Sequence, residues 1–445
     1  MAGKGNTLGV ALVGCGTVGG AVATLLTRDN KSILRDRVCP AIELRHIADV
    51  NFDHARKLKL DEKLFRDKAD EAIADPEVGA VVELIGGTTV AKQVVEKALK
   101  AGKNVVTANK ALLAKHGPEL LALARSKGVC IAFEASCGGG IPIIRALYDG
   151  LIANRIDAIY GIVNGTCNYI LTAMTQRGQS YSQGLAQAQK DGLAEADPTL
   201  DVAGIDSAYK LSILAGLAFG RKIDLAAIPV EGINALELCD INYGQELGYV
   251  VKLLAIAQRQ KDGVSLCVRP AFISKEHPLA WVSGPFNAIS VYGHATGHTM
   301  YYGRGAGGMP TASAVVADLV SVATGAAISA FDNLGIWCDR AENAQQLPIE
   351  AARFRYYIRV MAQDRPGVLA QIAAILGTHG ISIRSVLQHE PPAGAAGAGR
   401  VPVIITTHIA LEGNIRTAMA EVDNLQAVKS KSVCLGIVDE HPEEL

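Results

Sequence analysis

Three features are missing from this sequence: an excess of charge, a cysteine framework and a long apolar run. The 445 residues carry a formal net charge of −1, with no basic stripe and no acidic tail. That balance argues against nucleic acid or a membrane surface as a partner. The nine cysteines stand singly, without a CxxC pair, as expected for reduced thiols rather than a secreted disulfide scaffold. No apolar run reaches the ~18 residues of a membrane span, and the N-terminus shows no signal-peptide core. We therefore expect a cytoplasmic protein.

The N-terminus carries a glycine motif between a strand and a helix. Residues 8–13 are apolar and lead directly into Gly14, Gly16 and Gly19, which form GxGxxG with Thr17 and Val18 between them. These glycines allow a tight turn, an approach of pyrophosphate to the backbone and close packing of helix on strand. The motif predicts a dinucleotide site that uses the first helix N-terminus as its anion-binding end.

The next predicted strand, residues 42–48, ends at Asp49. An acidic residue at this position usually accepts hydrogen bonds from the adenosine ribose and favours NAD. Arg45, Lys57 and Lys59 lie nearby in the sequence and could instead meet the 2′-phosphate of NADP. The sequence therefore leaves both cofactors open.

A lysine follows the predicted strand at residues 105–107. In an open α/β sheet, ligands bind at the carboxyl ends of the strands. Lys110 is thus expected to face both cofactor and substrate, and the alternative is an exposed lysine at the start of a helix.

The stretch from 164 to 215 contains three charged residues of interest. Asp206 and Lys210 are four residues apart in a largely apolar segment, and this spacing places both on one face of a helix. Asp201 is expected to cap the start of that helix. Glu195 precedes it in the sequence AEADP. The alternative reading is an exposed ion pair without a role.

Two further glycine-rich turns interrupt the chain. The turn ASCGGGIP at 135–142 lets the backbone approach a ligand or an ion, or else serves as a hinge. The loop at 303–310 precedes a second apolar helix, for which Pro310 is suited to the first turn.

The tail alternates in the order βαββαβ, which predicts a ferredoxin-like unit. The expected elements are strands at 356–360, 381–388, 403–410 and 433–438 and helices at 368–376 and 414–422.

Taken together, NGTCNYIL, AEADP, DVAGIDSAYKLSILA, TANK and the GAGxxPTAS pattern resemble the homoserine dehydrogenase family, and the tail with DRPGVLA resembles an ACT domain. The resemblance implies an α/β fold with a Rossmann-type nucleotide-binding domain, an α+β catalytic and dimerisation domain and a ferredoxin-like ACT domain. The expected divisions are 1–140, completed by a returning helix at about 310–342; 141–309; a linker at 343–352; and 353–445.

The same resemblance implies an activity and its residues. L-homoserine and L-aspartate 4-semialdehyde would be interconverted with NAD or NADP, in the biosynthesis of threonine, methionine and isoleucine. Lys210, Lys110 and Asp206 would be catalytic, Glu195 and Asp206 would hold the substrate, and Gly307 would lie near the nicotinamide.

A monovalent cation, with sodium as the candidate, is implied as well. Its ligands would be the Glu134 carboxylate and the backbone carbonyls of Cys137, Gly139 and Ile141. The ACT domain would bind an amino-acid effector, for which threonine is the natural candidate, and the chain would form a homodimer or homotetramer. The alternatives are another ACT-bearing amino-acid oxidoreductase, a non-catalytic nucleotide or amino-acid sensor, and an ACT domain that serves only in oligomerisation.

The acidic end of the second strand generates a first prediction. We expect activity with both NAD and NADP, and we expect Asp49→Ala to change the ratio of their kcat/KM values, because an acceptor for the ribose is lost. Steady-state kinetics with each cofactor measures this ratio. An unchanged ratio would show that Asp49 does not discriminate between them.

Overall fold

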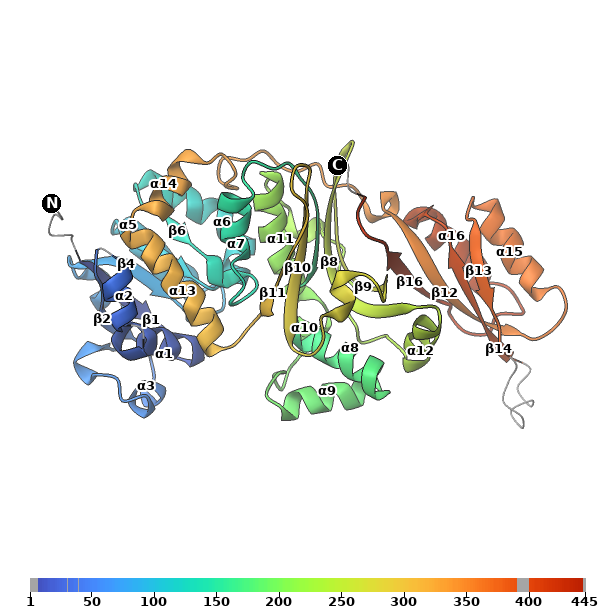
Figure 1. Ribbon diagram of the computed structural model, residues 1–445, viewed down its shortest axis with the longest axis horizontal. Helices are drawn as coiled ribbons and strands as arrows, with labels where there is room; N and C mark the ends of the chain where they lie inside the picture. Colours follow the sequence, from blue (N-terminus) through green and yellow to red (C-terminus); the bar gives the residue numbers. More distant parts are fainter. Residues whose placement is uncertain (1–6, 30, 39, 390–399, 443–445) are drawn as a thin grey trace.

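The computed structural model describes residues 7–29, 31–38, 40–389 and 400–442, which form two large sheets and their covering helices (Figure 1). The first sheet is parallel and has the strand order β3-β2-β1-β4-β5-β6. Its strands are β1 (Leu8–Val13), β2 (Ile42–Ala48), β3 (Phe65–Arg66), β4 (Val78–Glu83), β5 (Asn104–Thr107) and β6 (Ile131–Ala132). This order is that of a doubly wound nucleotide-binding domain, so the predicted Rossmann-type fold is confirmed.

Helices alternate with these strands, as right-handed crossovers between parallel strands require. They are α1 (Thr17–Thr24), α2 (Lys31–Arg37), α3 (Asp53–Lys57), α4 (Ala69–Ala74), α5 (Val90–Lys100) and α6 (Lys110–Ser126). The last strand of this sheet, β6, ends at Ala132, and a short 3-10 helix occupies Glu134–Ser136.

Two late helices return to this first sheet. α13 (Gly308–Ala323) packs against α1, and α14 (Ala326–Asn333) follows it, so both lie among the N-terminal elements in Figure 1. Asp318 of α13 accepts a 2.8 Å hydrogen bond from the backbone N–H of Glu134. No single helix of the described chain is long and apolar enough to cross a membrane; α13 and α14 reach that length only as a pair bent by 79°.

The second sheet runs through the middle and the tail of the chain in the order β11-β10-β7-β8-β9-β16-β12-β14-β13. Its middle strands are β7 (Ile156–Ile162), β8 (Tyr249–Gln260), β9 (Gly263–Ser274), β10 (Phe286–Gly293) and β11 (Gly297–Arg304). Between β7 and β8 the chain forms α8 (Gly165–Arg177), α9 (Tyr181–Lys190), α10 (Thr199–Val202), α11 (Ile205–Phe219) and α12 (Leu238–Glu246). α8 and α11 pack on β8.

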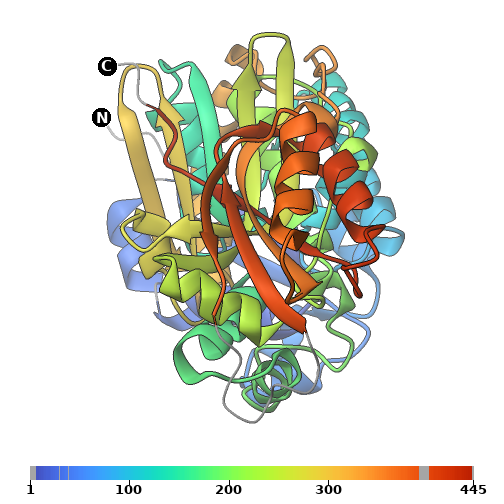
Figure 2. The same cartoon turned by 90° about the vertical axis from the view of Figure 1, so that its right-hand side faces the viewer.

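The tail has the predicted ferredoxin-like order. Its elements are β12 (Arg353–Gln363), α15 (Val368–Thr378), β13 (Ile383–Leu387), β14 (Arg400–Thr407), the two-residue β15 (Ala410–Leu411), α16 (Glu412–Asp423) and β16 (Val433–Val438). The last strand, β16, pairs in parallel with β9, with Ile437 opposite Phe272. The tail strands therefore continue the sheet of the middle region rather than forming a sheet of their own (Figure 2).

Buried charges cross this junction at two places. Arg359 of β12 donates two hydrogen bonds to Asp240 of α12, at 2.6 and 3.0 Å, and the Tyr357 hydroxyl donates a third at 2.9 Å. Arg269 of β9 donates to Glu412 of α16 at 2.7 Å. All four charged residues are buried. Removing one partner of such a pair typically costs about 3–5 kcal/mol, so the tail and the middle region stabilise each other.

Candidate active site

The glycine loop after β1 leaves room for a phosphate group. Gly14 has φ +96°, and a Cβ on it would lie 2.7 Å from the backbone of Leu84. A Cβ on Gly19 would lie 1.9 Å from the carbonyl oxygen of Gly14. By contrast, a Cβ on Gly16 would have no atom within 4 Å, and Gly16 precedes α1 without a capping side chain. Open space beside free N–H groups at a helix start is what a pyrophosphate needs, so the loop fits a dinucleotide.

A second helix begins beside the first. Gly307, with φ +122°, precedes α13, again without a capping side chain. A Cβ on Gly308 would lie 3.1 Å from the carbonyl oxygen of Thr17, so the two helix N-termini are adjacent. The partial positive charges of the two helix N-termini therefore both favour an anion bound beside them.

Asp49 lies beside the same loop. Its carboxylate accepts hydrogen bonds from the backbone N–H groups of Cys15, of Val50 at 2.6 Å and of Asn51 at 3.1 Å. Arg45 is engaged elsewhere, because it pairs with Glu43 and Glu77. Lys57 and Lys59 are exposed and form no ion pair with a described residue.

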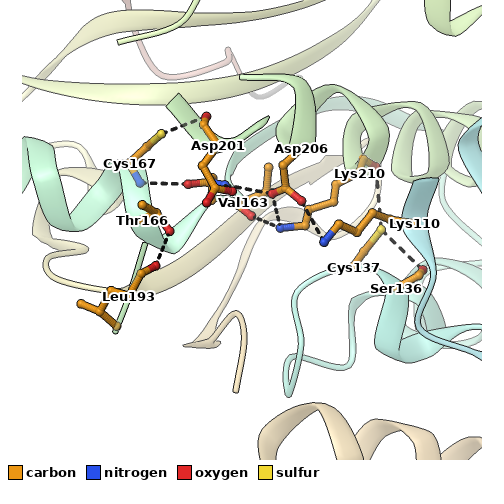
Figure 3. Close-up of polar contacts among 11 residues, drawn as sticks. Lys110, Ser136, Cys137, Val163, Thr166, Cys167, Leu193, Asp201, Asp206 and Lys210 are labelled. Atoms are coloured by element: carbon orange, nitrogen blue, oxygen red, sulfur yellow. Dashed lines mark hydrogen bonds and ion pairs between the residues drawn. The ribbon is translucent and has the colours of Figure 1, made fainter. Parts of the chain in front are cut away.

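The centre of the candidate site is one carboxylate shared by two lysines (Figure 3). Lys110, the first residue of α6, places its Nζ 3.0 Å from Asp206 Oδ1. Lys210 places its Nζ 2.7 Å from Asp206 Oδ2, one helical turn along α11. The Asp206 side chain is only 7% exposed, whereas that of Lys110 is 41% exposed. The pair predicted at i,i+4 is therefore buried, and Lys110 joins it from the nucleotide-binding part.

Asn164 positions this carboxylate. Its Nδ2 donates to Asp206 Oδ2 at 3.0 Å and to Asp201 Oδ1 at 2.7 Å, while its Oδ1 accepts from the Cys167 N–H as the N-cap of α8. Lys210 Nζ is held in turn by the carbonyl of Val163 at 2.6 Å. One amide thus fixes two carboxylates and a helix start.

The expected cap of α11 by Asp201 is wrong. Asp201 belongs to the separate turn α10, and α11 begins after Gly204, whose φ is +83°. A left-handed residue at that point turns the chain between α10 and α11. The Asp201 carboxylate accepts from Asn164 instead.

The charges at this centre reinforce one another. Burial acts to raise the pKa of Asp206, but Lys210 and Lys110 outweigh it, and the pKa lies well below the ordinary value. Burial acts to lower the pKa of Lys110, but Asp206 outweighs it, and that pKa lies above the ordinary value. Asp206 is therefore ionised and Lys110 protonated at neutral pH.

Glu195 does not join this cluster. It is exposed on the loop between α9 and α10, and its side chain forms no hydrogen bond or ion pair with any described residue. The loop itself is held beside the site, because the Thr166 hydroxyl donates to the carbonyl of Leu193 at 2.8 Å (Figure 3).

The predicted cation ligands lie in one buried turn. The Glu134 carboxylate accepts the N–H groups of Ile144 and Arg145 at 2.9 and 2.8 Å, and so caps the short helix α7 (Ile143–Arg145). The carbonyls of Cys137 and Gly139 accept no hydrogen bond from the described residues. Burial raises the pKa of the Cys137 thiol to about 12, so it is neutral. The turn thus offers two free carbonyls, whereas Glu134 already has protein partners and the Ile141 carbonyl accepts the N–H of Ile143 at 2.8 Å.

Asn164, Asp201 and Val163 were not expected from the sequence as members of the site. The local signal was the Asn-Gly-Thr run before an apolar segment, which is an N-cap pattern. Nothing in that pattern shows that the same amide reaches two carboxylates 37 and 42 residues away.

This geometry generates a second prediction. Asn164→Ala removes hydrogen bonds to two carboxylates, and hydrogen bonds to charged groups are worth about 1.5–3 kcal/mol. We expect kcat/KM for the reaction that the family resemblance implies to fall by about tenfold to a hundredfold, with little change in nucleotide affinity. Ser180→Ala is the matched control, because Ser180 caps the nearby α9 and contacts no site residue. If kcat/KM fell equally in the two variants, the role of Asn164 would be limited to capping α8.

The sequence and the fold are similar to those of known proteins. The sequence matches the family models of the homoserine dehydrogenase NAD-binding domain at residues 14–134, homoserine dehydrogenase at 142–320 and the ACT domain at 356–424. It is 45% identical to a homoserine dehydrogenase of Pseudomonas aeruginosa over 95% of this chain and 97% of that protein. The crystal structure of a homoserine dehydrogenase from Thiobacillus denitrificans superposes with a TM-score of 0.91 at 43% identity, covering 97% and 98% of the two chains. A hyperthermophilic archaeal homoserine dehydrogenase in complex with NADPH superposes at 0.58 with 26% identity, covering 71% of this chain and 97% of that one. The chain therefore belongs to the homoserine dehydrogenase family.

Proposed function

We propose that this protein catalyses the interconversion of L-homoserine and L-aspartate 4-semialdehyde with a nicotinamide nucleotide. The observation that carries this proposal is the buried Asp206 carboxylate, which holds one lysine from the nucleotide-binding part and one from the middle part. An acid-base pair placed between a nucleotide site and an open loop suits hydride chemistry at an alcohol carbon.

The two lysines retain donors for a substrate oxygen. An ammonium has three N–H donors. Lys210 uses two of them, on Val163 and Asp206, and Lys110 uses one, on Asp206. The remaining donors can bind the oxygen of the alcohol or aldehyde and stabilise an alkoxide.

Proton transfer is the work of these residues. When bound, the nucleotide accepts or returns the hydride. In the direction of aldehyde reduction, Lys210 donates a proton to the oxygen as negative charge develops there; in the reverse direction it takes the hydroxyl proton. Lys110 supplies a second positive charge at the same oxygen. Asp206 keeps both lysines in place.

Substrate recognition falls mainly to Glu195. Its exposed carboxylate has no described partner, so it is free to bind the substrate ammonium by a charge-assisted hydrogen bond. The Asp206 carboxylate already accepts hydrogen bonds from Asn164, Lys110 and Lys210. Its main contribution to substrate binding is therefore to position the two lysines.

We propose that the enzyme uses both NAD and NADP as cofactors. Asp49 at the end of β2 suits the ribose of NAD, while the unpaired Lys57 and Lys59 suit the 2′-phosphate of NADP. The archaeal relative's complex with NADPH supports the second use.

A sodium ion is proposed at the turn after β6, held by the carbonyls of Cys137 and Gly139 with Glu134 and Ile141 beside them. Two buried carboxyl groups lie close by, since Asp318 contacts the Glu134 backbone and burial raises the Asp318 pKa to about 8. A cation there would favour the ionised forms of these carboxyl groups.

Feedback inhibition by threonine through the ACT domain is proposed as well, in a pathway to threonine, methionine and isoleucine. A chain of contacts supports it. Glu412 of the ACT domain pairs with Arg269, and Arg269 lies 3.6 Å from Glu231.

The chain of contacts continues to the site. Two residues after Glu231, the N–H of Ile233 donates to the carbonyl of Val202 in α10 at 2.9 Å. α10 also carries Asp201, which Asn164 links to Asp206. A shift at Glu412 can therefore reach the catalytic carboxylate through contiguous packing.

We further propose that two or four copies of the chain assemble. β11 is an edge strand of the large sheet, and it exposes Met300 and Tyr302. An exposed edge with apolar side chains suits pairing with a second copy.

The proposed proton transfer generates a third prediction. Lys210→Ala should lower kcat by about 10²–10⁴, the usual contribution of general acid-base catalysis. Nucleotide affinity should change little, because Lys210 lies outside the glycine loop. Steady-state kinetics and a fluorescence titration with the nucleotide measure the two effects. A folded variant that keeps more than about a tenth of kcat would move proton transfer to Lys110.

The proposed regulation generates a fourth prediction. Threonine should inhibit the full-length enzyme, and Glu412→Gln should raise the threonine concentration for half-inhibition by about fivefold or more, the lower range of allosteric coupling. Point variants are preferable to removing the ACT domain, because truncation would also remove the ACT partners of two buried charges, Arg359 from Asp240 and Glu412 from Arg269.

Glu421→Gln is the matched control. Glu421 lies on the same helix, is 51% exposed and, among the described residues, pairs with His379 alone. Threonine sensitivity that is equal in the two variants would exclude the Glu412–Arg269 contact as the link. No inhibition of the unmodified enzyme would exclude threonine as the effector.

A further inference from the structure

A large cavity lies away from the residues of the candidate active site. It measures about 770 Å³ and lies between α6 and α11. The two helices meet at their first turns, where Lys110 and Asp206 pair, and the cavity opens farther along both. None of the glycine-loop residues, Lys110, Asp206 or Lys210 lines it.

The walls of the cavity are apolar. Leu113 and Leu121 face it from α6, Ile213 and Leu217 from α11, and Trp337 from the segment that follows α14. Trp337 is 4% exposed and fixed by a hydrogen bond from its indole N–H to the carbonyl of Ala330. Cavities of this size and lining are typical of sites for drug-sized molecules.

The border of the cavity is positively charged. Lys115, Arg221 and Lys222 line it and are exposed, against the single carboxylate of Asp224. Arg221 pairs with Glu342, and the Asp224 carboxylate accepts the N–H of Ala226.

Neither lysine forms an ion pair with a carboxylate of the described chain. The Lys115 Nζ lies 5.6 Å from the centre of the Tyr209 ring. Two cations are thus available to an anion at the opening of an apolar cavity.

We propose that this cavity binds an amphipathic organic anion, with an apolar ring or chain between α6 and α11 and a carboxylate or sulfonate at Lys115 and Lys222. Burial of the apolar part would supply most of the affinity. The lysines would select the anion over a neutral molecule. The site is separate from the nucleotide cleft and from the substrate loop.

Gly117 allows the cavity to be filled by mutation. It lies within α6 and lines the cavity, and a Cβ on it would have only Cys338 Sγ within 4 Å, at 3.8 Å. Gly117→Leu therefore occupies the space without a close contact at Cβ outside its chain neighbours. Because Pro118 follows and disfavours the helical conformation of the residue before it, the folding of this variant is checked by circular dichroism. Gly377→Leu is the matched control, because Gly377 lies in α15 with nothing within 4 Å of its Cβ.

The test uses 1-anilinonaphthalene-8-sulfonate as the probe. The chain has two tryptophans, and Trp281 is 80% exposed, so Trp281→Phe leaves Trp337 as the sole donor for energy transfer to the probe. Titration of this full-length variant with saturating NAD⁺, which fills the nucleotide cleft, should show saturable transfer with one probe bound per chain.

Added to this background, Gly117→Leu should weaken probe binding by about tenfold or more, which is about 1.4 kcal/mol. Lys115→Glu with Lys222→Glu should weaken it by a similar factor. Gly377→Leu and Lys127→Glu, a change at the exposed C-cap of α6, should leave it unchanged. Absence of saturable transfer, or equal affinity with and without Gly117→Leu, would overturn the proposal. If circular dichroism shows that Gly117→Leu does not fold, the double lysine variant decides in the same way.

Discussion

The organisation of this enzyme depends on the burial of one negative charge. The Asp206 side chain is 7% exposed and is stabilised by Lys110, Lys210 and Asn164. A buried carboxylate without partners would cost several kcal/mol, so the contact between α6 and α11, which supplies Lys110, favours the ionised form. Because Lys110 belongs to the nucleotide-binding part, the charged state of the site and the relative placement of the two parts depend on each other.

The same principle operates at the other end of the molecule. Asp240 and Arg269 of the middle region are buried, and their main partners, Arg359 and Glu412, come from the ACT domain. With β16 paired to β9, the ACT strands and the catalytic strands form one sheet. A displacement in the ACT domain would therefore separate buried charges, and packed interiors respond to such strain by switching between discrete arrangements rather than by gradual deformation.

Features with a local signal were predictable from the sequence. GxGxxG between a strand and a helix, Asp49 at the end of β2 and the i,i+4 spacing of Asp206 and Lys210 each depend on neighbouring residues, and the structure has these elements where they were expected. The strand limits of β2 and β16 also agree with the sequence analysis. Alternating or helical periodicity depends only on the face that is buried, so it can be read without knowledge of distant partners.

Polar residues at the ends of elements were harder to interpret, because one carboxylate can cap a helix, bridge two segments or bind a ligand. Distant residues decide among these uses. Asp201 bridges to Asn164 rather than capping α11, and Glu134 caps α7. The pairing of β16 with β9 also could not be predicted, because the periodicity of a segment shows that it forms a strand but not which distant strand it pairs with. Glu195 is the informative contrast: among the acidic residues singled out in the sequence, it is exposed and without a described partner. A charge that no described protein group satisfies is available to a ligand. This contrast with the better connected Asp206 is the basis for proposing Glu195 as the residue that holds the substrate ammonium.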